Sequence, residues 1–95
     1  MGDHDPQRLD QIIALADGWV QTGDLVAIDR AVTLLQHAAQ NLPAQDLNQA
    51  AVLFSLGFAL QQRFARSRDV RHLEEAIAIY RRAVARNLWL SRPIG

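Results

Sequence analysis

The chain has 95 residues, with ten acidic and ten basic side chains, 49% apolar residues and 6% aromatic residues, which describe one small globular domain. It contains no cysteine and all ten basic residues are arginine, which excludes thiolate chemistry, disulfides and lysine-based Schiff-base or phosphate-loop chemistry. Alanine, leucine, arginine and glutamine, which all favour helices, occupy 47 of the 95 positions. The composition therefore predicts an all-α protein that is not an enzyme.

The zero net charge hides an uneven distribution along the chain. Residues 1–46 carry seven acids against Arg8 and Arg30, a net charge of −5, whereas residues 47–95 carry eight arginines against three acids, a net charge of +5. Such asymmetry indicates how the surfaces of this protein meet other surfaces, and it does not predict the fold. The start of the chain, MGDHDPQRLD, lacks the basic and apolar regions of a signal peptide, and no apolar run is long enough to span a membrane. We expect a cytoplasmic protein without a membrane partner.

Apolar spacing and capping residues predict four helices in chain order. The first spans roughly Pro6 to Gln21, with proline in its first turn. A break follows in which Gly23 is expected to adopt the left-handed conformation and Asp24 to cap the next helix, about Leu25 to Asn41, with its side chain. Both helices carry apolar residues at the spacing of one buried face.

The second half of the chain repeats these signals. Pro43 ends the second helix, and Asp46 with Gln49 three residues later has the spacing of a capping box, with Asp in place of Ser or Thr. Asp69 is expected to cap the fourth helix. The third and fourth helices are predicted to end at about Arg66 and Asn87.

A shift of 45 residues lays the segment from Leu9 to Pro43 over the segment from Phe54 to Leu88. Five aligned pairs are identical and six more are similar in character. The identical pairs are Ala14/Ala59, Leu15/Leu60, Asp24/Asp69, Ala31/Ala76 and Ala38/Ala83. Small residues recur where two helices must approach closely, and large apolar residues recur where the gap must be filled. Two helix-turn-helix units at a fixed period are typical of an α-solenoid.

The second unit carries the more specific pattern, a Leu-Gly pair and an aromatic residue on one helix followed by Ala-x3-aromatic-x2-Ala on the next. These residues are Leu56, Gly57, Leu60, Phe64, Ala76, Tyr80 and Ala83. The pattern resembles the tetratricopeptide (TPR) repeat. The first unit keeps Ala31-x3-Leu35-x2-Ala38 and the closing Pro43, but has Gln11-Ile12 in place of Leu-Gly. The fold class expected is therefore all-α, two TPR-like helix-turn-helix repeats, with an ordinary four-helix bundle as the alternative.

The stretch from Leu56 to Val84 is also similar to the long-period TPR units of actinobacterial multidomain proteins, which have an LG-x-AL-x-x-RF segment, a TGD turn and a DEAI-x-x-YRRAV helix. Here the turn reads Ser67-Arg68-Asp69, while the first unit retains Thr22-Gly23-Asp24. The resemblance implies a protein-binding scaffold. We expect a single domain over residues 1–95, with repeat one at about 6–43, repeat two at about 46–88 and a C-terminal tail at 89–95.

The third helix is apolar on two faces. The resemblance implies that its Leu-Gly face packs on the following helix and that its other face lines a concave groove together with the first helix. The expected protein-binding groove residues are Leu9, Ile13, Phe54, Phe58, Gln61 and Gln62. Such a groove suits an amphipathic or extended peptide. The alternative is that these side chains are core, or are buried by another copy of the chain.

Two repeats are fewer than the three normally needed for a stable stack, so we expect a homodimer. An antiparallel twofold dimer would set the acidic half of one chain against the basic half of the other and is favoured, while head-to-tail stacking remains the alternative. Possible contacts to an acidic protein partner are Arg63, Arg66, Arg81 and Arg82. Balanced charge and few aromatic residues argue against nucleic acid as the partner.

The remaining titratable residues predict no catalytic, cofactor or metal site. His4, His37 and His72 lack metal-ligand spacing, and Glu74-Glu75 diverge around a helix in its first turn. The apolar tail after Asn87 is expected to fold back and cap the fourth helix, with insertion into a neighbouring groove as the alternative. The function predicted is a self-associating interaction module. The alternative function is an accessory subunit of an enzyme or biosynthetic complex, whose partner supplies the chemistry.

Overall fold

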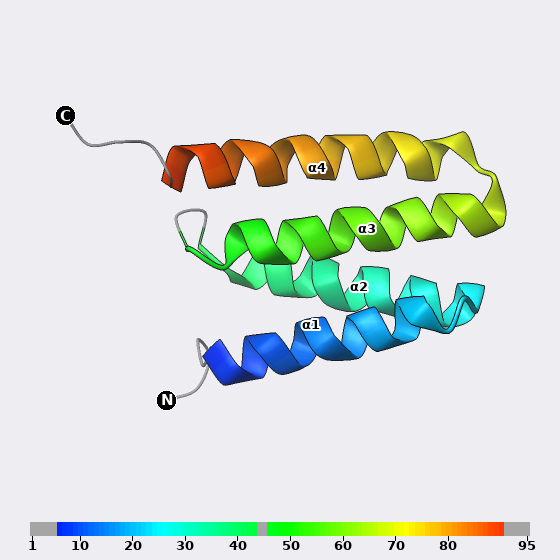
Figure 1. Ribbon diagram of the computed structural model, residues 1–95, viewed down its shortest axis with the longest axis horizontal. Helices are drawn as coiled ribbons and strands as arrows, with labels where there is room; N and C mark the ends of the chain where they lie inside the picture. The colour runs from blue at the N-terminus through cyan, green and yellow to red at the C-terminus, as the bar shows by residue number, and fades with distance from the viewer. Residues whose placement is uncertain (1–5, 44–45, 91–95) are drawn as a thin grey trace.

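The computed structural model describes residues 6–43 and 46–90, with side chains at 8–43 and 46–87. It contains four helices, α1 (Pro6–Gln21), α2 (Leu25–Asn41), α3 (Gln49–Ser67) and α4 (Val70–Leu90), which form two consecutive helical hairpins (Figure 1). No strand occurs among the described residues. The all-α class is confirmed. Helix α4 continues three residues beyond the predicted end at Asn87, so residues 89 and 90 of the expected tail are helical.

The helices form an open stack in which each contacts its neighbours. Helix α3 packs most extensively on α4 and also contacts α2 and, less, α1, whereas α4 contacts α3 alone among the described helices. The molecule measures 45 × 31 × 18 Å, and Figure 1 shows the helices side by side in the order α1, α2, α3, α4. A closed four-helix bundle would place α1 against α4, and among the described residues no contact joins these two helices. The chain is therefore a pair of stacked hairpins.

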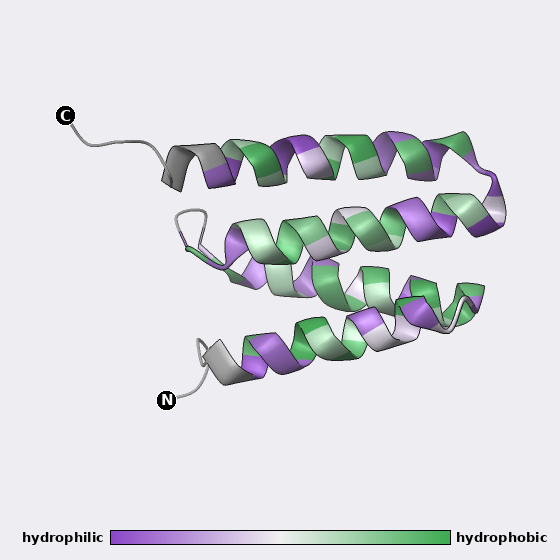
Figure 2. Ribbon diagram, viewed as in Figure 1, coloured by the Kyte–Doolittle hydropathy of each residue, from purple (hydrophilic) through white to green (hydrophobic). Residues whose placement is uncertain are grey.

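Alanines occupy the positions where helices cross. The core contains fully buried small residues alternating with large ones, which allows close helix approach with the gaps filled. The small residues are Ala16, Ala31, Ala59, Ala76 and Ala83, and the large ones are Ile28, Leu35, Leu53, Leu60 and Val52. Figure 2 shows hydrophobic residues over most of α3, while hydrophilic and hydrophobic bands alternate along α4. The difference follows from burial, because α3 packs against helices on two sides, whereas α4 packs only against α3 among the described helices.

Gly57 marks the closest approach between α3 and α4. A Cβ atom placed on Gly57 would lie 2.8 Å from two ring carbons of Tyr80, closer than side chains approach each other. The Leu-Gly face of α3 therefore packs on α4, as the resemblance implied. Gly18 on α1 has open space where a Cβ would lie. A side chain at Gly57 would therefore clash with Tyr80, whereas a side chain at Gly18 would meet no neighbour.

The turn between α1 and α2 is organised by Thr22 and Gly23. Gly23 has φ +73°, the left-handed conformation predicted for it. The Thr22 hydroxyl donates to the carbonyl of Trp19 at 2.7 Å and accepts the Asp24 N–H at 3.2 Å. Asp24 occupies the N-cap position of α2, but its side chain makes no capping hydrogen bond. The predicted side-chain cap is therefore wrong, because the threonine hydroxyl, not the carboxylate, holds the turn.

The turn between α3 and α4 uses Asp69 as predicted. Its carboxylate accepts the Arg71 N–H at 3.0 Å and two hydrogen bonds from the Arg71 guanidinium at 3.2 and 2.8 Å. The Arg71 guanidinium, with help from the Arg71 N–H, lowers the pKa of Asp69 from 3.8 to about 2. Because the folded state lowers this pKa, the stabilisation is present above about pH 4 and is lost as the pH falls through 2.

Gln49 joins the two hairpins in a way that differs from the predicted capping box. Asp46 accepts the Asn48 N–H at 2.8 Å, but the buried Gln49 side chain does not return to Asp46. Its amide nitrogen instead donates to the carbonyls of Ala39 at 2.8 Å and Leu42 at 3.1 Å. Carbonyls at the end of a helix lack intrahelical partners, and Gln49 satisfies two of them at the end of α2. The reciprocal capping prediction is wrong for that reason.

We predict opposite effects of alanine at the two helical glycines. Gly57→Ala should lower the free energy of unfolding by about 1–3 kcal/mol, because the Tyr80 ring must move. Gly18→Ala should raise it by about 0.5–1 kcal/mol, because alanine favours the helix and meets no neighbour. Urea titrations followed by circular dichroism measure both. Equal effects of the two substitutions would contradict the close approach of α3 and α4.

We also predict a stabilising substitution at Arg68, which adopts φ 60° where the first repeat has glycine. The left-handed conformation disfavours side chains with a Cβ, so Arg68→Gly should raise the free energy of unfolding by about 0.5–1 kcal/mol. Arg82→Gly, at an exposed position inside α4, should lower it by about 1 kcal/mol. A loss of thermal stability in Arg68→Gly would contradict the assigned backbone conformation.

Candidate functional site

Two phenylalanines of α3 stand one helical turn apart on an exposed face. Phe54 is 40% exposed and Phe58 is 44% exposed, although phenyl rings are usually buried. They border a shallow depression of about 320 Å³ between α1 and α3, lined by Asp17, Gln21, Phe54, Ser55 and Phe58. We call this depression the α1/α3 groove. It lies on the elements where the groove was predicted.

The α1 wall of the groove differs from the expected one. Leu9 and Ile13 are half-buried and pack against the core, so their side chains are only partly available. Asp17 and Gln21, one to three turns further along α1, are the residues that line the depression beside the phenylalanines. The sequence pattern assigned apolar residues of α1 to the groove because Leu9 and Ile13 align with Phe54 and Phe58 in the repeat. In the folded chain those two α1 side chains lie partly in the core.

Tyr80 extends the aromatic surface from α3 onto α4. Its ring centroid lies 6.3 Å from that of Phe54, with the planes tilted by 45°. Burial raises the pKa of Tyr80, and its hydroxyl donates a hydrogen bond to the Gln61 side chain at 3.2 Å. Gln61 is exposed and Gln62 is half-buried. Sequence reasoning did not assign Tyr80 to the groove and gave it only as the aromatic residue of the Ala-x3-aromatic-x2-Ala pattern.

The four arginines predicted to meet an acidic partner lie at separate places. Arg63 is half-buried, and its Nε lies 2.7 Å from Oδ1 of Asp29 on α2, as an ion pair. The Arg66 guanidinium lies over Gly23, at the turn between α1 and α2. Arg81 and Arg82 are exposed on α4. The structure therefore ties Arg63 into an intramolecular contact and does not gather the four into one basic cluster.

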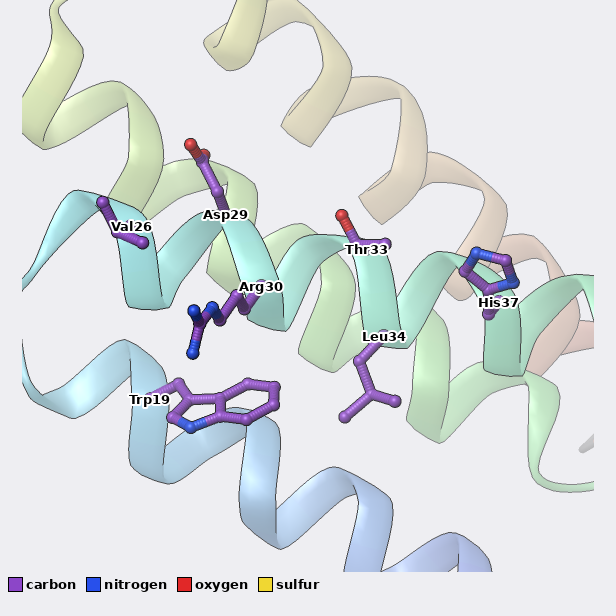
Figure 3. A pocket seen from close by; sticks show the side chains of 7 residues that line it. All are labelled: Trp19, Val26, Asp29, Arg30, Thr33, Leu34 and His37. Atoms are coloured by element: carbon purple, nitrogen blue, oxygen red, sulfur yellow. The ribbon is translucent and has the colours of Figure 1, made fainter.

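A second depression, which sequence reasoning did not find, lies on the outer face of the first hairpin. It has a volume of about 480 Å³ and is lined by Trp19, Val26, Asp29, Arg30, Thr33, Leu34 and His37. Figure 3 shows the Trp19 ring and Leu34 facing the space between α1 and α2, while Asp29 points away from Trp19. That direction agrees with the ion pair from Asp29 to α3. The sequence signal that could have indicated this surface is the large aromatic side chain of Trp19, which the fold leaves half-buried.

The histidines do not converge with other titratable groups. His37 is exposed, and His72 uses Nδ1 in a 2.8 Å hydrogen bond with the Ser67 hydroxyl at the turn between α3 and α4. Among the described residues, no group of three or more histidine, aspartate or glutamate side chains could hold a metal ion. Within the described ranges, none of the four helices has the length and apolar character that crossing a membrane requires.

Comparison with known proteins gives no relative from which a function could be transferred. No family model, curated protein or solved structure matches the chain.

Proposed function

We propose that this chain is a non-enzymatic, cytoplasmic protein-interaction module, a TPR-like scaffold that self-associates and presents the α1/α3 groove to a protein or peptide. The observation that carries the proposal is the pair of exposed rings, Phe54 and Phe58, on the helix that is otherwise the most completely buried. Aromatic side chains dominate the binding energy of protein interfaces because they bury a large area at a small entropic cost. Two such rings left exposed on a central helix suit a partner surface.

The groove combines apolar and polar contacts. The rings of Phe54 and Phe58 offer apolar area, while the Asp17 carboxylate and the Gln21 amide stand on the opposite wall. An amphipathic partner segment would bury its apolar side chains against the rings and place polar or basic groups beside Asp17. The groove is shallow, so we expect a helix or an extended peptide and not an enclosed small molecule.

Self-association is the second part of the proposal. Two hairpins leave the outer face of α4 without a helix packed on it among the described residues, and this face carries exposed apolar side chains. Clustered exposed apolar side chains on a small protein are typical of interaction sites.

Phe58→Glu tests the groove, with Leu47→Glu as the matched control, since Leu47 is exposed outside the groove. Both variants should keep the helical circular dichroism of the wild type, because both side chains are exposed. In affinity purification from the native cell, Phe58→Glu should lose the partner by at least tenfold, while Leu47→Glu retains it. Retention of the same proteins by a folded Phe58→Glu variant would contradict the groove, and so would unfolding of Phe58→Glu.

A further inference from the structure

The internal repeat identifies which face of α4 is uncovered. With the 45-residue shift, Val32 on α2 corresponds to Ile77 on α4, and Ala39 corresponds to Val84. Val32 is 3% exposed and lies three residues after Asp29, whose side chain pairs with Arg63 on α3, whereas Ile77 is 44% exposed. Helix α4 therefore carries apolar residues on the face that α2 buries, and none of the described helices covers that face.

Five residues follow one another along this uncovered face at alternating spacings of four and three. They are Val70, Glu74, Ile77, Arg81 and Val84, and all five are exposed. This is the spacing of a seam between two paired helices. We call these five residues the α4 stripe. A depression of about 440 Å³, lined by Ile77, Tyr80, Arg81, Val84 and Ala85, runs along part of it. The stripe therefore has both apolar side chains and space for side chains of a partner.

The α4 stripe is complementary to the same stripe of a second chain when the two helices run in opposite directions. Read from Val70, the stripe is apolar, acidic, apolar, basic and apolar, with Ile77 at its centre. If a second α4 lies antiparallel with Ile77 opposite the partner's Ile77, then Glu74 lies within one residue, about 1.5 Å of helix rise, of the level of the partner's Arg81 and can pair with it. Val70 then lies opposite the partner's Val84. Every apolar residue meets an apolar residue and every charge meets its opposite.

Other pairings of the α4 stripe are less favourable. A parallel pairing would place Glu74 against the partner's Glu74 and Arg81 against the partner's Arg81, which costs free energy. Head-to-tail stacking would repeat the packing of α3 on α2 by placing α1 of a second copy on α4. The residue of α1 that corresponds to Arg63 of α3 is Gly18, which has no side chain to fill the space or to pair with Glu74 as Arg63 pairs with Asp29.

We propose that the chain forms a twofold homodimer through antiparallel pairing of α4 with the partner's α4, centred on Ile77. This inference rests on the self-association in the proposed function and specifies its surface and symmetry. The twofold contact is isologous, so it closes at two chains. The stripe extends over 15 residues, about 21 Å of helix from its first residue to its last, so the interface is small and the dimer should dissociate at low micromolar concentrations.

Charge exchange within the stripe tests both the surface and the symmetry. Glu74→Arg sets two arginines against each other at each end of the interface, and Arg81→Glu sets two glutamates against each other. Each single variant should raise the dimer dissociation constant at least tenfold, measured by sedimentation equilibrium. The double variant Glu74→Arg/Arg81→Glu should restore the wild-type value. A mixture of the two single variants should form a heterodimer, because the two chains then carry opposite charges at both ends.

A cysteine at the predicted twofold axis gives an independent readout. The chain has no cysteine, so Ile77→Cys introduces the only thiol. Residues at the centre of an antiparallel helix pair come within disulfide range, so mild oxidation should link most chains into covalent dimers. Val26→Cys, which is exposed on α2, should remain uncrosslinked at the same concentration.

The outcomes separate this inference from the proposed function. A wild-type chain that stays monomeric at high concentration contradicts both self-association and the α4 dimer. A wild-type dimer that is unchanged by Glu74→Arg, or in which Ile77→Cys does not cross-link, contradicts the α4 pairing and leaves self-association intact. Failure of the double variant to restore the dimer, when both single variants weaken it and all are helical, contradicts the antiparallel order. Partner capture through Phe58 is measured separately and is affected by none of these results.

Discussion

The arrangement of this protein depends on the close packing of α3 between its neighbours. Helix α3 contacts all three other helices, and it meets α4 most extensively. Because it packs on two sides, it needs small residues on both, Ala59 in the core it shares with α2 and Gly57 against Tyr80. The remaining face of α3 is then the only one left for exposed residues, and it carries Phe54 and Phe58. The position of the groove follows from the packing.

The same packing explains why α4 differs from α2, although the two helices share a repeat pattern. Both bury an alanine-lined face against the preceding helix, through Ala31 in one and Ala76 in the other. The two helices differ on the face that points away from the preceding helix. On α2 this face is covered by α3, whereas on α4 no described helix covers it. The chain keeps apolar residues there, such as Ile77, which is costly for a solvent-exposed surface. Pairing of two α4 helices would remove that cost.

Part of the charge asymmetry of the sequence is used within one chain. The acidic and basic halves meet within one chain, where Arg63 pairs with Asp29. Glu74 and Arg81 both belong to the basic half, and the proposed dimer pairs them with each other. The twofold symmetry favoured from the sequence is retained in the proposal, but its electrostatic reason is local to α4 and does not involve the two halves as wholes.

Helix positions could be predicted closely because apolar spacing, Gly23 and Asp69 are local signals. The resemblance implied that the Leu-Gly face of α3 packs on α4, and the close approach of Gly57 to Tyr80 agrees with it. Where the local pattern predicted the wrong partner for a side chain, the reason is a tertiary contact. Gln49 reaches the end of α2 and so does not complete the local capping box, and Leu9 and Ile13 turn toward the core although they align with exposed rings. The expected cap by the apolar tail concerns side chains outside the described residues.

If two chains of this protein associate through a symmetric helix pair, the mass of the wild-type chain in solution must double as its concentration rises. Sedimentation equilibrium over a range from nanomolar to high micromolar concentration should show a transition from the 10.6 kDa chain to twice that mass, with no larger species. A mass of 10.6 kDa at every concentration would contradict the association of two chains. Continued growth beyond the dimer would contradict the closed twofold symmetry and favour head-to-tail stacking.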